Sequence, residues 1–94
     1  MASLYIRHRV ADYESWKRGY DDAEWLRKKH GILLASVSRD PADRNVVMAF
    51  HRFKDMKGAK AFSEEVPALM KEIGVQGTPE IWFGEDVEQT AYTL

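Results

Sequence analysis

The segment from Asn45 to Phe53 constrains the fold more strongly than any other part of this sequence. It reads Asn-Val-Val-Met-Ala-Phe-His-Arg-Phe, and every position from Val46 to Phe50 is apolar. Because successive side chains of a strand point to opposite faces of a sheet, this strand presents apolar groups on both faces. The pattern predicts a central strand that is covered on both sides.

Shorter periodic segments on either side complete an alternation of strands and helices. Residues 3–10 alternate between two sets of side chains, which is typical of a strand with one buried face. Further strands are predicted at residues 32–38 and 80–83. Turn-forming residues at 40–43 separate the second predicted strand from the third.

The first helix is predicted to run from a cap at Asp12 to about Lys29. The Asp12 carboxylate can accept hydrogen bonds from the free amides of the first turn. Apolar and aromatic residues recur at spacings of three and four and form one stripe, which consists of Tyr13, Trp16, Tyr20, Ala23 and Leu26. Gly19 costs about 1 kcal/mol relative to Ala inside a helix, which indicates a close approach to a neighbouring element. The basic run of residues 27–29 is expected where the helix ends, because the helix dipole favours cations there.

A second helical region follows the central strand. Asp55 is predicted to cap a helix of residues 56–65. Pro67 cannot continue a helix but can begin one, so a separate short helix is expected over residues 67–73.

The resulting order is β-α-β-β-α-β, the ferredoxin-like split unit of the α+β class. It predicts a four-stranded antiparallel sheet in the spatial order 4-1-3-2, with the helices on one face because crossovers are right-handed. The other sheet face is then apolar and uncovered, which marks an interface. A homodimer that packs two such sheets face to face is the commonest way to bury it.

Length and composition exclude several classes of protein. The 94 residues are expected to form a single domain, residues 1–94, and 14 basic against 15 acidic residues give no footprint for nucleic acid. The absence of cysteine excludes disulfides and thiolate metal sites. No apolar run approaches the length of a membrane span, and the N-terminus has no signal-peptide core. We therefore expect a cytoplasmic protein that has no nucleic acid or membrane as a partner.

Motifs that hold cofactors are also missing from the sequence. It contains no glycine-rich phosphate loop, no nucleophile elbow and no spacing of metal ligands. Neither a metal nor an organic cofactor is expected.

Several motifs together resemble a known family. The run of residues 7–17 carries a strand into a helix through an Asp-Tyr-x-x-Trp-Lys pattern, and Tyr20-Asp21 and the segment 27–31 follow it. The later motifs are Ser38-Arg39-Asp40-Pro41, Asn45-Val46-Val47, Ala59-Lys60-Ala61-Phe62, Gly74-Val75 and Pro79-Glu80-Ile81. This set, which spans about residues 5–83, resembles the dimeric α/β-barrel superfamily. It is similar in particular to small bacterial proteins of the antibiotic biosynthesis monooxygenase-like or cyclase-like type.

The resemblance implies a homodimer in which two sheets form a barrel with the helices outside. It also implies a pocket in each subunit between the sheet and the helices. Relatives of this kind include cofactor-free monooxygenases of phenolic polyketides, aromatic polyketide cyclases and haem-degrading enzymes. The haem-degrading type uses an Asn on the first strand, and the first strand of this sequence has none.

Two histidines are candidates for the pocket. His8 shares the apolar side of the first strand with Ile6 and Val10, so it is either a catalytic base for a phenol or enol proton or a buried histidine satisfied by a helix group. His51, near the end of the third strand, is a candidate for substrate binding. The two lie towards opposite ends of the expected strand pair, which argues against a shared metal.

Aromatic residues and one arginine complete the candidate substrate site. Trp16 and Tyr20 lie on the inner stripe of the first helix, and Trp82 lies on the last strand. Together they either fill the core or line a flat aromatic site. Arg39, near the hairpin, is a candidate for the mouth of the pocket.

Three functions remain open from the sequence. The first is a cofactor-independent monooxygenase or cyclase that acts on a small aromatic or polyketide-like substrate, with His8 as the base. The second is a non-catalytic homodimer that binds a small ligand or serves in a stress response. The third is a structural dimer whose aromatic residues simply fill the core. Room for a ring in a pocket lined by His8 would favour the first two.

Overall fold

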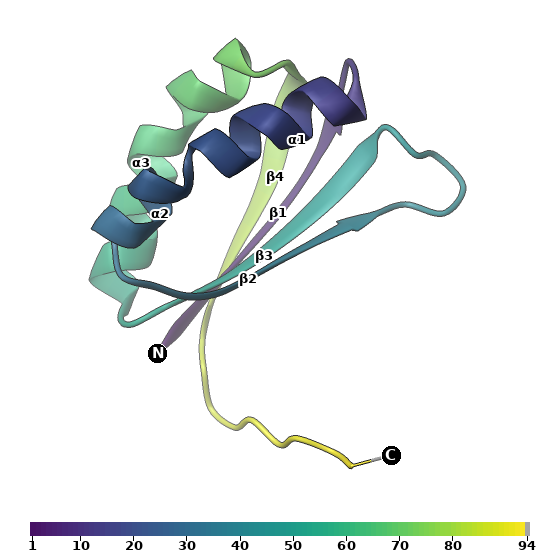
Figure 1. Ribbon diagram of the computed structural model, residues 1–94. Helices are drawn as coiled ribbons and strands as arrows, with labels where there is room; N and C mark the ends of the chain where they lie inside the picture. Colours follow the sequence, from purple (N-terminus) through teal and green to yellow (C-terminus); the bar gives the residue numbers. More distant parts are fainter. Residues whose placement is uncertain (94) are drawn as a thin grey trace.

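In the computed structural model, which describes residues 1–93, a sheet carries all of its helices on one side (Figure 1). The elements are β1 (Ala2–Val10), α1 (Tyr13–Asp22), α2 (Glu24–Lys29), β2 (Ile32–Arg39), β3 (Val46–Phe53), α3 (Met56–Glu72) and β4 (Val75–Glu85). The strands lie in the order β2-β3-β1-β4, and each is antiparallel to its neighbours. The predicted ferredoxin-like order and the helices on one face are confirmed.

The register of the two central strands decides which side chains face the helices. Leu4 lies opposite His51, and His8 lies opposite Val47. All four of these residues are buried, so they belong to the face that the helices cover. The histidines thus lie apart along the strands, as expected, but on the same face of the sheet.

The predicted first helix is divided in two at Ala23, and the expectation of one continuous helix is wrong. The amide of Ala23 bonds to the carbonyls of Gly19 and Tyr20. The guanidinium of Arg27 donates a further hydrogen bond of 2.8 Å to the Tyr20 carbonyl. In a continuous helix the Tyr20 carbonyl would accept a hydrogen bond from the amide of Glu24, four residues later. Here the Arg27 side chain donates to this carbonyl instead.

The two predicted helices after β3 are one, because α3 runs without a break through Pro67. Proline removes one helical hydrogen bond. Pro67 lies on the exposed side of α3, where water can reach the backbone that it leaves unpaired. Phe62, Val66 and Met70 form a buried stripe on the opposite side, and their packing holds the helix together across the proline.

β4 begins five residues earlier than residue 80, where the last strand was expected. Pro79 lies inside it, and the pairing with β1 shifts register between Arg7 and Arg9. A proline is tolerated here because β4 is an edge strand, so one side of its backbone needs no partner.

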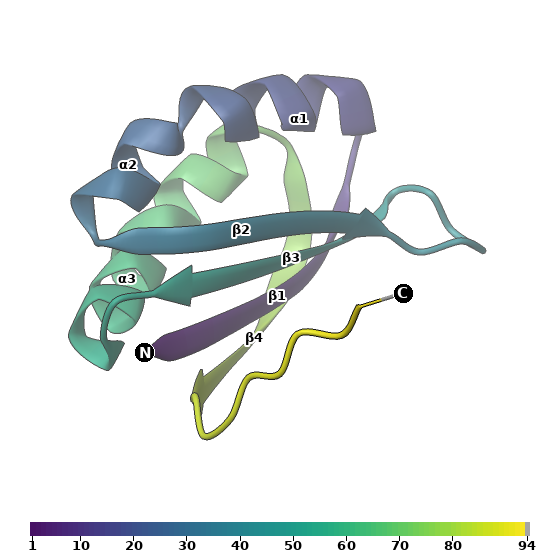
Figure 2. The same ribbon diagram turned by 60° about the horizontal axis from the view of Figure 1, so that its bottom comes forward.

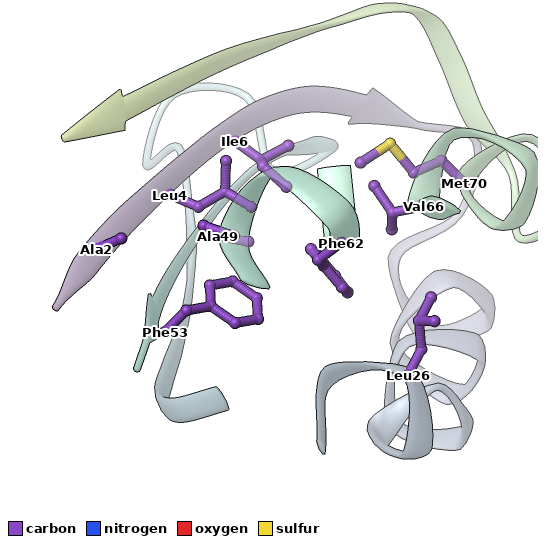
Figure 3. Packing of buried hydrophobic residues seen from close by; sticks show 10 residues of the cluster. Ala2, Leu4, Ile6, Leu26, Ala49, Phe53, Phe62, Val66 and Met70 are labelled. Atoms are coloured by element: carbon purple, nitrogen blue, oxygen red, sulfur yellow. The ribbon is translucent and has the colours of Figure 1, made fainter. Parts of the chain in front are cut away.

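The main core lies between the sheet and the helices (Figure 3). Leu4 and Ile6 of β1 and Phe53 of β3 pack towards Phe62 of α3 and Leu26 of α2. A smaller cluster of Val10, Trp16 and Val47 continues this core towards α1.

Gly19 marks the place where α1 and α3 meet. A Cβ atom at this position would lie 2.5 Å from Cγ2 of Ile73. The close approach expected from this glycine is confirmed.

The other face of the sheet carries no helix, as the turned view shows (Figure 2). The chain leaves β4 at Asp86, whose side chain is bound to residues of β1 and β3. Its carboxylate accepts a hydrogen bond from Ser3 of β1 and pairs with Arg52 of β3 at 2.9 Å. Within residues 1–93 no helix has the length and apolar character that crossing a membrane requires.

Candidate functional site

A small chamber lies between the sheet and the helices. Its volume is about 30 Å³. It is lined by Ile6, His8, Trp16, Tyr20, Ala23, Arg27, Ala49, His51, Phe62, Val66, Leu69, Met70 and Ile73. Strands β1 and β3 supply the floor and helices α1, α2 and α3 the walls, so four of the residues singled out from sequence line one cavity: His8, Trp16, Tyr20 and His51.

Tyr20 and His51 form the central polar pair of the chamber. The Tyr20 hydroxyl lies 2.9 Å from Nε2 of His51. The Tyr20 ring stacks on Trp16, with 5.0 Å between ring centroids and 29° between ring planes. The phenol is therefore held both at its face and at its tip.

Trp16 contacts His8 as well as Tyr20 of this pair. The His8 ring meets the Trp16 ring edge-on at 5.4 Å between centroids. Among the described residues, no group bonds to Nδ1 of His8 or to Nδ1 of His51, and both atoms are buried. Buried polar atoms in proteins normally have partners, and those that lack one are candidates for function.

Burial keeps both imidazoles neutral. It lowers the pKa of His51 to about 4, with a smaller contribution from the positive charge of Arg27. Burial also lowers the pKa of His8 from its usual value. It raises the pKa of Tyr20, which the charge of Arg27 partly offsets. At neutral pH the chamber therefore holds two uncharged imidazoles, each able to accept a proton, beside an uncharged phenol.

Arg27 is the chamber residue that the sequence analysis missed. Only 7% of its surface is exposed, and its guanidinium lies 3.9 Å from the centre of the Tyr20 ring. Tyr20 is thus sandwiched between Trp16 and Arg27. The spacing of the sequence indicates a position for Arg27 in the chamber, since residues 16, 20, 23 and 27 fall on one helical stripe. The neighbouring lysines made Arg27 look like part of an exposed cationic helix end.

Trp82 lies on the other face of the sheet, outside the chamber. It pairs with Tyr5 across β1 and β4 and is 52% exposed. Both residues line an open apolar groove of about 390 Å³ on the helix-free face, together with Phe50. Because side chains alternate along β4, Trp82 points away from the side that Ile81 shares with the core, so its expected place beside Trp16 and Tyr20 is wrong.

Arg39 also lies outside the chamber. Its Nε donates a 2.8 Å hydrogen bond to the Arg44 carbonyl across the hairpin. Its guanidinium lies 3.9 Å from the centre of the Tyr13 ring. Arg39 thus fixes the hairpin to the start of α1 and does not line the cavity.

The acidic and histidine side chains of residues 1–93 nowhere gather in a group of three that could hold a metal ion. His8 and His51 line the same chamber from different strands, and no carboxylate is among its lining residues. What the arrangement can supply is proton acceptance by imidazole next to stacked aromatic rings.

Solved structures place this geometry in a known fold. SnoaB, a cofactor-independent oxygenase from Streptomyces nogalater, superposes with a TM-score of 0.72 at 9% identity, over 94% of each chain. The monooxygenase ActVA-Orf6 of Streptomyces coelicolor, solved with nanaomycin D, gives 0.67 at 16% identity, over 98% of this chain and 92% of that one. The chain has the antibiotic biosynthesis monooxygenase fold. No protein-family model and no curated protein matches the sequence.

A third structure of the antibiotic biosynthesis monooxygenase fold comes from Caulobacter crescentus. It has a TM-score of 0.71 at 18% identity and covers 93% of this chain and 90% of that one. At such identities the likeness extends to the fold, and the chemistry must be argued from the side chains of this chain. In this antibiotic biosynthesis monooxygenase fold, the two buried imidazoles and the phenol of Tyr20 line the sheet–helix chamber.

Proposed function

We propose that the protein is a cofactor-independent monooxygenase or cyclase that acts on a small aromatic, polyketide-like molecule in the sheet–helix chamber. The observation that carries the proposal is the convergence of two neutral, buried imidazoles and a phenol on one aromatic-walled cavity. The fold that the chain shares with a cofactor-independent oxygenase supports the same class of reaction.

In this proposal His8 is the catalytic base. Neutral imidazole accepts the proton of a substrate phenol or enol, and the resulting anion is rich in electrons. A phenolate ring carbon can then combine with dioxygen, which acts as the oxidant: one oxygen atom enters the ring, the other leaves as water, and a quinone results. In a cyclase, the enolate carbon attacks a carbonyl carbon of the same molecule instead, and the alkoxide that forms takes up the proton that His8 had accepted. Neither course requires a cofactor.

Trp16, Tyr20 and His51 are the proposed binding residues. Trp16 and Tyr20 contribute aromatic rings to the chamber wall against which the substrate ring is proposed to pack. His51 fixes the Tyr20 hydroxyl through the hydrogen bond between them. Trp82 and Arg39 take no part in this site.

A substrate ring enters only if the chamber widens. A cavity that binds benzene has a volume of about 150 Å³, whereas this chamber has about 30 Å³. Met70 and Ile73 line the wall formed by α3 and the turn after it. Met70 can change its conformation readily because its side chain is unbranched, so the proposal places the opening at this wall.

The small volume also favours a second candidate function, a non-catalytic homodimer. In this alternative the chamber is part of the core, and the protein acts through its helix-free sheet face. The open groove beside Tyr5, Phe50 and Trp82 would be covered by a second subunit. A small ligand would then bind without being converted.

Oxygen consumption with a panel of phenols and naphthols separates the two. We expect His8→Ala to lower kcat by about 10²–10⁴-fold, the usual contribution of a general base. His30→Ala is the matched control, because His30 lies outside the chamber and is expected to leave turnover unchanged.

Turnover that survives His8→Ala at full rate would remove the proposed base. Stabilisation of the protein by phenols in a thermal shift assay, without oxygen uptake or ring closure, would favour the non-catalytic homodimer.

A further inference from the structure

The charge of the sheet–helix chamber points to the class of ligand that it accepts. We infer that the chamber holds its ligand as an anion, a phenolate, enolate or carboxylate, and that Arg27 is the residue that binds this anion. This inference rests on the chamber that the proposed function uses, and it names the substrate class of that site.

Arg27 has no acidic partner among the described residues. Arg52 of β3, which is half-buried, pairs with Asp86, and Arg7 of β1 pairs with Glu80. Among the ion pairs of residues 1–93, none involves Arg27. Because a guanidinium keeps its proton at every accessible pH, Arg27 carries an uncompensated positive charge with 7% of its surface exposed.

No other residue that lines the chamber cancels the positive charge of Arg27. The other ionisable residues of the chamber are His8, His51 and Tyr20, all uncharged at neutral pH. The acid next to Tyr20 in sequence, Asp21, is exposed and bound to Lys17. The chamber therefore has a formal charge of +1, and a buried charge without a partner is costly unless an ion of opposite sign joins it.

Arg27 also donates a hydrogen bond to the Tyr20 carbonyl at the break between α1 and α2. This bond uses one of five N–H donors of the guanidinium. Stacking on the Tyr20 ring fixes the plane of the group. A cation that is fixed in this way is preorganised for a planar anion, because little side-chain freedom is lost on binding.

The inference also explains how the proposed base can work. An anion is stabilised beside Arg27, so a phenol bound in the chamber has a lowered pKa. Proton transfer to His8 then leaves the substrate as a phenolate next to a guanidinium.

Isothermal titration with a matched pair of probes tests the inference. Benzoate and benzamide have nearly the same shape and differ in charge. We expect benzoate to bind the wild-type protein at least about tenfold more tightly, as one charge-assisted hydrogen bond implies. In Arg27→Gln this preference is expected to fall to within about twofold.

Lys28→Gln is the matched control. It removes the same charge from the next residue of α2, whose side chain is exposed and pairs with Glu24. The control should retain the benzoate preference. If Arg27→Gln does not fold, Arg27→Met removes the charge with an apolar side chain of similar length.

Three results would overturn the inference: binding of benzamide as tight as that of benzoate, a benzoate preference that survives the loss of Arg27, or no binding of either probe. A purely structural Arg27 would lower the melting temperature when replaced and leave the ratio of the two affinities unchanged. Because the titration measures binding, a protein that prefers benzoate through Arg27 but neither consumes oxygen nor closes a ring would refute only the proposed function.

Discussion

At the scale of single residues, the chamber shows how burial determines chemistry. His51 is 1% exposed, and its contacts are with aromatic rings and with the hydroxyl of Tyr20. Such surroundings disfavour the charged imidazolium, which lowers the pKa of His51 to about 4. The same imidazole in an unfolded chain takes up a proton near pH 6.5.

This difference predicts an acid-sensitive fold. Between pH 6.5 and about 4 the unfolded state binds a proton at His51 and the folded state does not, so stability falls as the pH is lowered through this window. The full loss is on the order of 3 kcal/mol, since each pKa unit corresponds to about 1.4 kcal/mol. Urea unfolding at a series of pH values measures it.

His51→Gln should flatten this dependence, because glutamine does not titrate and can still bond to the Tyr20 hydroxyl. Tyr20→Phe keeps the buried imidazole and is expected to keep the acid sensitivity. A pH dependence that His51→Gln leaves unchanged would assign it to other groups. His8, whose pKa is also lowered by burial, would then be the next residue to replace.

At the scale of elements, the contact between α1 and α3 depends on one missing methyl group. The two helices approach so closely at Gly19 that Ile73 occupies the place of a side chain. Tight contacts of this kind fix the position of α1, and with it Trp16 and Tyr20, over the sheet.

Gly19→Ala is therefore expected to destabilise the protein, although alanine favours helices. The added methyl group would meet the Ile73 side chain, and overpacking of this kind costs about 1–3 kcal/mol. Thermal or urea unfolding measures the change. Gly84→Ala is the control, because a Cβ at Gly84 would come no closer than 4.0 Å to Tyr5.

Shortening the neighbour should restore part of the loss, because Ile73→Ala removes the Cγ2 atom that the added methyl group would meet at 2.5 Å. Ile73→Ala is therefore expected to be less harmful in the Gly19→Ala background than alone. If Gly19→Ala proves as stable as the wild type, the contact between α1 and α3 is looser than its geometry indicates.

The same elements show what the sequence could and could not predict. The order of strands and helices along the chain followed from periodicity, because alternation and helical spacing are local patterns. The break at Ala23 did not, because it depends on Arg27 bonding to a carbonyl seven residues earlier in the chain. The continuity of α3 through Pro67 also escaped prediction, since burial of Val66 and Met70 is a tertiary effect.

The candidate site divides along the same line. His8, Trp16 and Tyr20 could be placed from strand alternation and helical spacing, and His51 follows from its alignment in β3. The spacing also puts Arg27 on this helical stripe, but its charge predicts exposure, and only the surrounding helices bury it. Trp82 was misplaced because its aromatic ring suits a ligand site, whereas the alternation along β4 puts it on the face opposite to Ile81.

At the scale of the whole molecule, the helix-free sheet face is the main exposed apolar surface to be explained. Tyr5 and Trp82 are about half exposed there, and the groove between them is lined almost wholly by apolar atoms. Exposed surfaces of this kind mark contacts with other proteins, and a second copy of the chain offers the matching face.

We therefore predict a homodimer in solution, which sedimentation velocity would detect as a species of twice the mass of the chain. Trp82→Glu should yield the monomer, because it places a charge in the middle of the apolar face. Trp25→Glu is the control, since Trp25 is exposed on α2, away from that face. A monomeric wild-type protein would leave the face without its proposed partner.

The position of β1 has a consequence for the synthesis of the protein. This strand is made first, yet it lies between β3 and β4, and β4 is the last strand to be made. On the ribosome β1 must therefore wait, with one edge unpaired, until nearly the whole domain has emerged. Its two partner strands come from distant parts of the chain, so the complete sheet is expected to form only after β4 has left the ribosome, and nascent chains that end earlier would depend on chaperones to shield the apolar side of β1.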